Sequence, residues 1–211
     1  MVKLRHLVTA GAVASIVLLI LAVVAPSAAE APKVQPAAGS LAGQLLVATP
    51  KMPDPRFAQT VIYMVRHDAT GAMGLIVNRP IRDVPLAHLL ERLGMESDGV
   101  SGSIRVHYGG PVAGKRGFML HSADYVGKGT TIVHGGVALT DQPDILTAIA
   151  AGTGPHHSLF AVGYAGWSPG QLEAEMGAGH WVTAPADEAL LFEGDYRGKW
   201  QRAMDRRIIR L

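Results

Sequence analysis

The stretch that decides the fold is QLLVATPKMPDPRFAQTVIYMVRHDATGAMGLIVN, residues 44–78, in which three apolar runs are separated by turn-forming residues. The runs at 44–49, 60–67 and 73–78 are rich in branched and aliphatic side chains and are bounded by Pro, Asp or Gly, which is typical of short β-strands. Between the second and third runs, the sequence DATG predicts a hairpin. Similar runs predict further strands at residues 104–108, 117–121, 130–133 and 159–164.

Helical patterns are fewer and lie among the later strands. Residues 84–93 and 141–151 carry apolar side chains at helical spacing and precede Gly94 and Gly152, a residue type that commonly ends helices. The basic stretch 197–211 predicts an amphipathic helix. Its basic face is either solvated or offered to an acidic partner or an anionic lipid surface. Strands grouped first, with helices interspersed later, favour the α+β class.

The best-marked helix is predicted over residues 168–176. Ser168 is placed as its N-cap, Pro169 as its first residue and Gln171 as the partner that completes a capping box. On that interpretation, Ser168→Ala costs about 1 kcal/mol of stability. The same segment matches the G-x-S-x-G pattern of a nucleophile elbow. However, Pro169 lacks the N–H that an oxyanion hole needs, and no histidine follows His180.

The amino-acid composition excludes several classes of protein and of functional site. The chain of 211 residues is 48% hydrophobic and 17% charged, which excludes an intrinsically disordered protein. It contains no Cys, which excludes disulfides, thiolate metal sites and a cysteine nucleophile. His67, His121 and His180 each end a strand-like run and could meet in a zinc site, although the sequence fixes no geometry for one. We expect no metal and no cofactor.

The glycine-rich segment GGPVAGKR, residues 109–116, is one residue short of a phosphate-binding loop. Arg116 stands where a Ser or Thr would hold Mg²⁺, and a strand rather than a helix follows. We therefore interpret the segment as a tight glycine turn between strands.

Residues 1–29 show the order of a secretory signal peptide. Lys3 and Arg5 form a basic start, residues 7–29 carry no charge, and Pro26 is followed by three small residues. An uncleaved membrane anchor through residues 7–25 and a start codon placed too early are the alternatives. Both export interpretations place the protein in the periplasm or anchored in the inner membrane. Residues 30–43 are interpreted as a flexible linker and residues 44–211 as one domain.

The leader also dominates the net charge. Without residues 1–29 the chain has 17 basic residues, that is 19 minus Lys3 and Arg5, against 17 acidic ones. A formally neutral domain lacks the basic balance of a nucleic-acid-binding protein, so we expect no nucleic-acid partner if the protein is exported.

Three ordered blocks of this sequence resemble the bacterial YqgE/AlgH family, over residues 44–200. The first block has LVATP at 46–50, DPRF at 54–57, VIYMVRH at 61–67 and GAMGLIVNRP at 71–80. The second has GGPV at 109–112, RGF at 116–118 and LH at 120–121. The third has GYAGW at 163–167, GQLE at 170–173, Trp181 and PAD at 185–187.

The resemblance implies an α+β fold with a mixed, bifurcated β-sheet curled into a pseudo-barrel with a few flanking helices. It implies no established reaction; one branch of the family carries the label of transcriptional regulator of exopolysaccharide (alginate) production. We find no helix-turn-helix or other DNA-binding motif here. Two features depart from the family pattern. Arg66 stands where relatives commonly have Cys, and relatives are usually cytoplasmic and lack a leader.

Three hypotheses for function remain open, of which the third, regulation in the cytoplasm through nucleic acid, needs a basic face and is ruled out if the leader exports the protein. The first is a non-catalytic interaction or regulatory module with an unknown protein partner and an undetermined oligomeric state. Its candidate contact residues are polar or aromatic and lie beside glycine turns: Asp54, Phe57, His67, Asn78, Arg79, Arg116, His121, Trp167, Gln171 and Glu173. The alternative is an unrecognised hydrolase or metal-dependent enzyme that uses His67, His121 and Asp54 or Glu173.

The leader generates the first testable prediction. Fused to a reporter enzyme, residues 1–29 should carry it out of the cytoplasm, because they have the basic, apolar and small-residue order of a signal. The mass of the mature N-terminus should then separate a cleaved signal from a retained anchor. Retention of the reporter in the cytoplasm would contradict both export interpretations.

Overall fold

The computed structural model describes residues 39–208, within which the chain forms ten strands and five helices. The strands are β1 (Gln44–Ala48), β2 (Val61–Asp68), β3 (Gly71–Ile76), β4 (Pro80–Pro85), β5 (Ser103–Tyr108), β6 (Val112–Ser122), β7 (Thr130–His134), β8 (Val137–Thr140), β9 (Ser158–Trp167) and β10 (Trp181–Pro185). The helices are α1 (Leu86–Arg92), α2 (Asp144–Ala150), α3 (Gln171–Gly177), α4 (Glu188–Phe192) and α5 (Tyr196–Asp205). The predicted leader, residues 1–29, lies outside the described residues.

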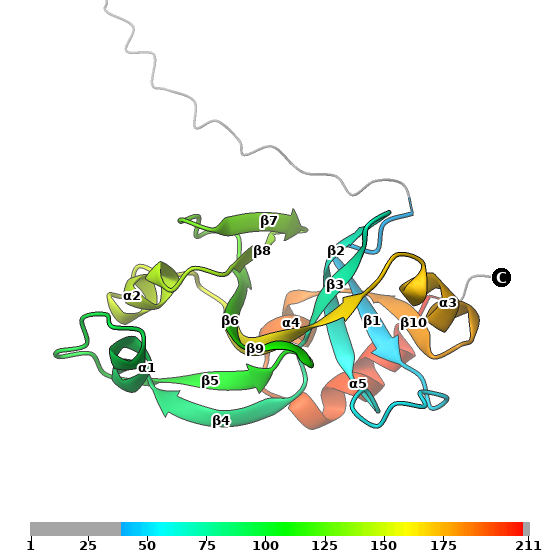
Figure 1. Ribbon diagram of the computed structural model, residues 1–211. Helices are drawn as coiled ribbons and strands as arrows, with labels where there is room; N and C mark the ends of the chain where they lie inside the picture. The colour runs from blue at the N-terminus through cyan, green and yellow to red at the C-terminus, as the bar shows by residue number, and fades with distance from the viewer. Residues whose placement is uncertain (1–38, 209–211) are drawn as a thin grey trace, which may run out of the picture. The chain divides into compact units, whose positions relative to one another are not determined.

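The sheet is mixed and branches at β9, as expected from the resemblance. Its main path runs β10-β1-β2-β3-β9-β6-β8-β7, and β5 joins β9 as a side branch that carries β4. The β5–β9 pair is parallel, and every other pair in the sheet is antiparallel. The curled strands form a half-barrel, with the β4–β5 arm reaching away from β1, β2 and β3 (Figure 1).

Both faces of the β1–β3 end are buried. Successive side chains of a strand point to opposite faces, so neighbouring residues of β1 belong to different cores. Leu45 and Val47 of β1 belong to a core that α4 and α5 cover with Leu190, Leu191 and Ala203. The intervening Leu46 and Ala48 belong to a second core that α3 covers with Leu172. A third core lies between α1, α2 and the strands β5, β6 and β9.

The strand predictions are confirmed except at three places. The seven predicted runs correspond to β1, β2, β3, β5, β6, β7 and β9, and the hairpin forms with Gly71 at its end. Strands β4, β8 and β10 were not predicted. β4, for example, has the sequence PIRDVP, whose residues are exposed or half-buried. A strand with no buried residue lacks the apolar alternation on which the prediction depends.

The helix at α3 differs from its prediction. It begins at Gln171, three residues later than expected, and Gly170 precedes it with φ +75°. The Ser168 side chain makes no capping bond. Instead, the Gln171 Oε1 accepts the Ser168 N–H at 3.1 Å, so only the return half of the capping box is present. The predicted cost of Ser168→Ala is therefore wrong, because that hydroxyl satisfies no helix N–H.

The other helices are shorter than predicted but end where expected. Residues 84–85 belong to β4, so α1 begins at Leu86, and α2 begins at Asp144 after Pro143. Gly94 and Gly152 follow these helices with φ +70° and +71°. Among residues 39–208, no helix is both long and apolar enough to cross a membrane.

The basic C-terminal helix packs against the domain. Trp200 and Met204 of α5 lie against the first core, and the Trp200 indole N–H donates to the Ala48 carbonyl at 2.7 Å. Lys199 is fully buried and donates to the Leu191 carbonyl at 3.1 Å, and burial lowers its pKa to about 8. The helix ends at Asp205 rather than continuing to 211, and Ile208 pairs with Thr183 of β10.

The described end of the predicted linker, residues 39–43, is hydrogen-bonded to the domain through Ser40, Leu41 and Gly43. Leu41 is buried in the second core, and its N–H donates to His67 Nδ1 at 3.1 Å. The chain is therefore fixed from Leu41 onward.

A glycine crossing joins the branches of the sheet. Gly109 donates to the Val162 carbonyl of β9 at 2.9 Å and accepts from the Ile76 N–H of β3 at 3.0 Å. A Cβ on Gly110, whose φ is +150°, would overlap the Tyr164 carbonyl of β9. Residues 109–111 thus form the expected glycine turn, while β6 already begins at Val112 and has a bulge before Gly117.

This crossing predicts that Gly110→Ala lowers the free energy of unfolding by at least about 2 kcal/mol, because backbone must move to admit the methyl group. Gly114→Ala is the matched control, since a Cβ there meets nothing within 4 Å, and it should change stability by less than about 0.5 kcal/mol. Urea denaturation of both variants measures the difference. Equal losses would contradict the steric role of the crossing.

Candidate functional site

At the end of the sheet formed by β1, β2, β3 and β10, one carboxylate accepts hydrogen bonds from two tryptophans. Glu175 of α3 accepts the Trp167 indole N–H at 3.0 Å and the Trp181 indole N–H at 2.7 Å on the same oxygen, Oε2. Its other oxygen accepts from Gln171 Nε2 at 2.9 Å. We call Phe57, Trp167, Gln171, Glu175 and Trp181 the tryptophan cluster.

Aromatic contacts extend the cluster to the surface. The Trp167 and Trp181 rings meet edge to face with centroids 5.9 Å apart, and Phe57 meets Trp181 in the same way at 5.7 Å. Edge-to-face pairs of this kind stabilise beyond the area that they bury. Phe57 belongs to the 49–60 loop between β1 and β2, so the cluster connects that loop to α3.

Two adjacent residues that follow β3 hold the 49–60 loop through hydrogen bonds. The Asn78 side chain accepts the Val61 N–H and donates to the Gln59 carbonyl, both at 2.9 Å. Arg79 donates to the Ala58 carbonyl at 2.9 Å. Gln59 has φ +54°, an uncommon conformation for a residue other than glycine. Three sequence-predicted residues, Phe57, Asn78 and Arg79, therefore converge on one loop.

Asp54 shapes the same loop. Its carboxylate accepts the Arg56 backbone N–H at 2.9 Å and pairs with the Arg56 guanidinium at 2.7 Å. The hydrogen bond from the Arg56 side chain lowers the pKa of Asp54. The carboxylate thus stays ionised and engaged within its own turn.

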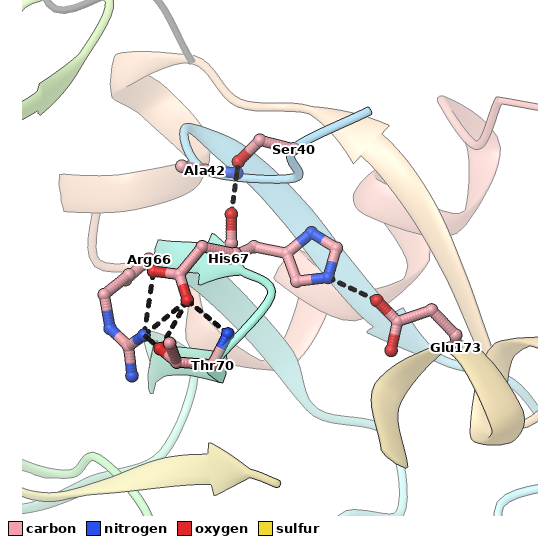
Figure 2. Close-up of polar contacts among 7 residues, drawn as sticks. Ser40, Ala42, Arg66, His67, Thr70 and Glu173 are labelled. Atoms are coloured by element: carbon pink, nitrogen blue, oxygen red, sulfur yellow. Dashed lines mark hydrogen bonds and ion pairs between the residues drawn. The ribbon is translucent and has the colours of Figure 1, made fainter. Parts of the chain in front are cut away.

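His67, near the end of β2, has both ring nitrogens engaged, and Figure 2 shows the contact with Glu173. Nδ1 accepts the Leu41 N–H at 3.1 Å, which leaves Nε2 as the protonated nitrogen that donates to Glu173 Oε1 at 2.7 Å. The pKa of Glu173 is lowered by hydrogen bonds from its own backbone N–H and from His67. Glu173 and Glu175 therefore serve different faces of α3, because residues two apart on a helix do not face each other.

Arg66, in place of the family's Cys, belongs to the hairpin tip. Its guanidinium pairs with Asp68 at 2.9 Å and donates to the Thr70 hydroxyl at 2.7 Å, as Figure 2 shows. Hydrogen bonds from Thr70 and Arg66 lower the pKa of Asp68 to about 2. Arg66 thus stabilises the turn between β2 and β3.

His121 lies far from His67. Its ring is buried, with Nε2 at 2.8 Å from the Thr140 hydroxyl and Nδ1 at 2.8 Å from the Ser122 carbonyl. His121 pairs with Ser158 at one end of β9, whereas His67 is joined through Ala72 of β3 to Trp167 at the other end. These ends are about 30 Å apart along an extended strand. The His67–His121 site of the enzymatic alternative is not formed.

The three-histidine zinc site is likewise not formed. Within residues 39–208, no group of three or more His, Asp or Glu side chains is arranged to hold a metal ion. The reason is topological, since the strands that hold His67 and His121, β2 and β6, lie on opposite sides of β9 in the strand order.

Arg116 lies apart from the other candidates. It belongs to β6, pairs with Asp141 and lies with its guanidinium 5.3 Å from the Phe118 ring centroid. Sequence reasoning missed Trp181 as a candidate and missed the acceptor role of Glu175. The spacing of four between Gln171 and Glu175 was a usable signal, because it places both on one helix face.

The tryptophan cluster predicts that Glu175→Ala lowers the free energy of unfolding by about 2–4 kcal/mol and changes tryptophan fluorescence, because two buried indole N–H groups lose their acceptor. Glu173→Ala, two residues away on the exposed face, should cost less than about 1 kcal/mol. Denaturation followed by fluorescence compares the two. A Glu175→Ala protein as stable as the Glu173→Ala control would refute the role of this carboxylate.

Comparisons with known proteins agree with this fold. A family model described as DUF179, AlgH-like, matches residues 45–211. A UPF0301 protein of Methylobacterium sp. (strain 4-46) is 46% identical over 188 residues, which cover 85% of this chain and 90% of the relative. A UPF0301 protein of Rhodospirillum rubrum is 45% identical over 168 residues, 80% of this chain and 88% of the relative.

Solved structures give the same result. The solution structure of the AlgH protein from Pseudomonas aeruginosa is similar with a TM-score of 0.70 and 43% identity, covering 82% of this chain and 91% of that one. A crystal structure of a Corynebacterium diphtheriae protein shares the fold at 21% identity, with a TM-score of 0.61 over 84% of this chain and 91% of that one. The chain belongs to the AlgH-like family.

Proposed function

We propose that this protein is a non-catalytic interaction module that binds a protein partner through the 49–60 loop and the exposed face of α3. The observation that carries the proposal is the conformation of Gln59. A positive φ at a residue other than glycine costs on the order of 1 kcal/mol, and such strain concentrates at functional loops. Here Asn78 and Arg79 maintain it by holding the carbonyls of Gln59 and Ala58.

The loop also combines exposure with fixed geometry. It contains neither helix nor strand, yet the Phe57–Trp181 contact and the bonds from Asn78 and Arg79 hold it on the sheet. Loops that are positioned by a rigid scaffold are frequent binding elements. A partner would therefore meet a surface that needs little ordering on binding, which reduces the entropic cost of association.

The polar groups of this end are engaged in ways that favour binding over catalysis. A general base needs an available lone pair, and His67 uses its lone pair to accept the Leu41 N–H. Glu175 accepts three hydrogen bonds from Trp167, Trp181 and Gln171. A regulatory role would then follow from the partner that the surface binds.

The exposed groups suggest a polar partner surface of mixed charge. Lys51, Arg56, Gln171 and Glu173 are exposed, with Pro53 and Pro55 between the charged residues of the loop. Such a combination resembles the polar part of a transient protein–protein interface. We expect binding that weakens with added salt.

Site-specific photo-crosslinking in the producing cell tests the proposal. A photoreactive residue at Arg56 and, separately, at Gln171 should trap the same partner protein, because the two positions share one surface. His88 of α1 and Lys128, between β6 and β7, are exposed control positions that belong to neither the 49–60 loop nor α3.

The Arg79→Ala variant adds a second readout. Without the bond to Ala58 the loop loses one of its fixed points, so trapping at Arg56 should fall severalfold while circular dichroism stays unchanged. Trapping of equal strength at all four positions, or none at Arg56 and Gln171, would refute the proposed surface.

A further inference from the structure

An open groove of about 510 Å³ lies away from the β1–β3 end of the sheet, between the β4–α1 side and the β6–α2 side. These elements are seen at the left of Figure 1. The groove volume falls within the roughly 300–1,000 Å³ that is typical of sites for small organic ligands. It shares no residue with the 49–60 loop or α3, so it is independent of the proposed partner surface.

The floor of the groove is apolar. It is lined by side chains that contain only carbon, hydrogen and sulfur: Val106, Met119, Ile145, Leu146, Phe160 and Val162. The strands beneath them are hydrogen-bonded to one another, with β5 and β6 on either side of β9. Peptide groups lying on this floor would be desolvated without partners, which is costly, whereas an alkyl chain has no such groups.

The mouth of the groove keeps apolar side chains in contact with solvent. Ile81 of β4 and Leu93, just after α1, line it and are 54% and 48% exposed. Large aliphatic residues gathered at one opening favour an apolar ligand that covers them.

The rim is strongly cationic. Arg82, Arg92, Lys115 and Arg116 line the groove together with one carboxylate, Asp141, which gives a net charge of +3 from four cations minus one anion. Arg116 is paired with Asp141. The ion pairs within residues 39–208 include none for Arg82, Arg92 or Lys115. Cations of one sign around a low-dielectric cleft attract anions.

We propose that this groove binds a single-chain amphipathic anion, a free alkyl or acyl carboxylate, with the chain on the apolar floor and the carboxylate held at the rim by Arg82, Arg92 and Lys115. Arg116 stays paired with Asp141 and closes the rim beside them. The apolar floor selects the chain, and the unpaired cations select the charge.

Methyl NMR of the full chain tests this proposal with three ligands of matched chain length, the two charged ones kept below their micelle-forming concentrations and the alcohol below its solubility limit. Dodecanoate should shift the methyl signals of Met119, Ile145 and Leu146 in a saturable manner. Dodecanol should bind at least tenfold more weakly because it lacks the charge, and dodecyltrimethylammonium should bind more weakly still. Shifts that fall mainly outside the groove, or equal affinity for all three ligands, would overturn the proposal.

Variants separate the contributions of rim and floor. The triple variant Arg82→Gln, Arg92→Gln and Lys115→Gln should weaken dodecanoate binding at least tenfold and leave dodecanol binding unchanged. Leu89→Trp, which fills the groove from α1, should weaken both ligands. The control triple variant Lys128→Gln, Arg197→Gln and Arg207→Gln removes the same charge from exposed positions outside the groove and should change neither.

Vesicles distinguish a free amphiphile from a bilayer surface. The proposal would be overturned in favour of membrane contact by three results together. The protein would sediment with anionic vesicles, the rim variant would not, and dodecanoate would cause no shifts of the groove methyl signals. Circular dichroism verifies that each variant is folded. An unchanged dodecanoate affinity in the folded rim variant would also overturn it.

Discussion

The branched sheet of this protein depends on one strand, β9, which pairs with three other strands. One edge of β9 carries β6, while the other edge carries first β5 and then β3. Two strands can follow each other along one edge only if the chain between them passes very close to it. Gly109, Gly110 and Gly163 permit that approach, since a Cβ at each would overlap backbone of the opposing segment. The steric requirement for glycine is thus a condition for the branched sheet.

The branching gives the two ends of the sheet different packing. At the β1–β3 end both faces are buried, by α3 on one side and by α4 and α5 on the other. That end can therefore hold a strained loop in place. Along β5 and β6, α1 and α2 pack on the apolar side chains but leave part of them lining an open groove. One fold thereby carries a rigid convex feature, the 49–60 loop, and a concave apolar one.

The sequence was sufficient for features that depend on local pattern and insufficient for those that depend on distant contacts. The apolar runs of β1, β2 and β3 predict strands because burial on a sheet requires them, and the family resemblance supplied the bifurcated topology. β4 was missed because no residue of PIRDVP is buried; it exists by pairing with β5. Ser168 was misassigned because a capping box in sequence does not determine where Gly170 turns the chain.

The candidate site shows the same limit. Phe57, Trp167 and Gln171 were identified individually from the sequence, but the residues that join them were not. Glu175 accepts hydrogen bonds from Trp167, Gln171 and Trp181. Trp181 contacts Phe57, and its position follows from the pairing of β10 with β1. His67 and His121 looked equivalent because both lie near the ends of apolar strands, and only the strand order reveals that these strands lie on opposite sides of β9. The groove could not be predicted at all, because its lining comes from seven separate helices and strands and from two connections.

The way in which polar groups are paired separates structural from functional candidates here. Histidines and carboxylates suggest catalysis in a sequence, yet His67, His121 and Glu175 each have their hydrogen-bonding capacity taken up by neighbours that fix the chain. Removing such a group leaves buried partners unsatisfied, so its first effect is on stability. Arg82, Arg92 and Lys115 were not candidates from the sequence, but they line the groove beside its apolar floor, and the ion pairs within residues 39–208 include none of them. Cations held together in this way repel one another, and a bound anion would relieve that repulsion. Unpaired charge beside apolar surface is therefore the stronger physical reason for assigning a ligand to this fold.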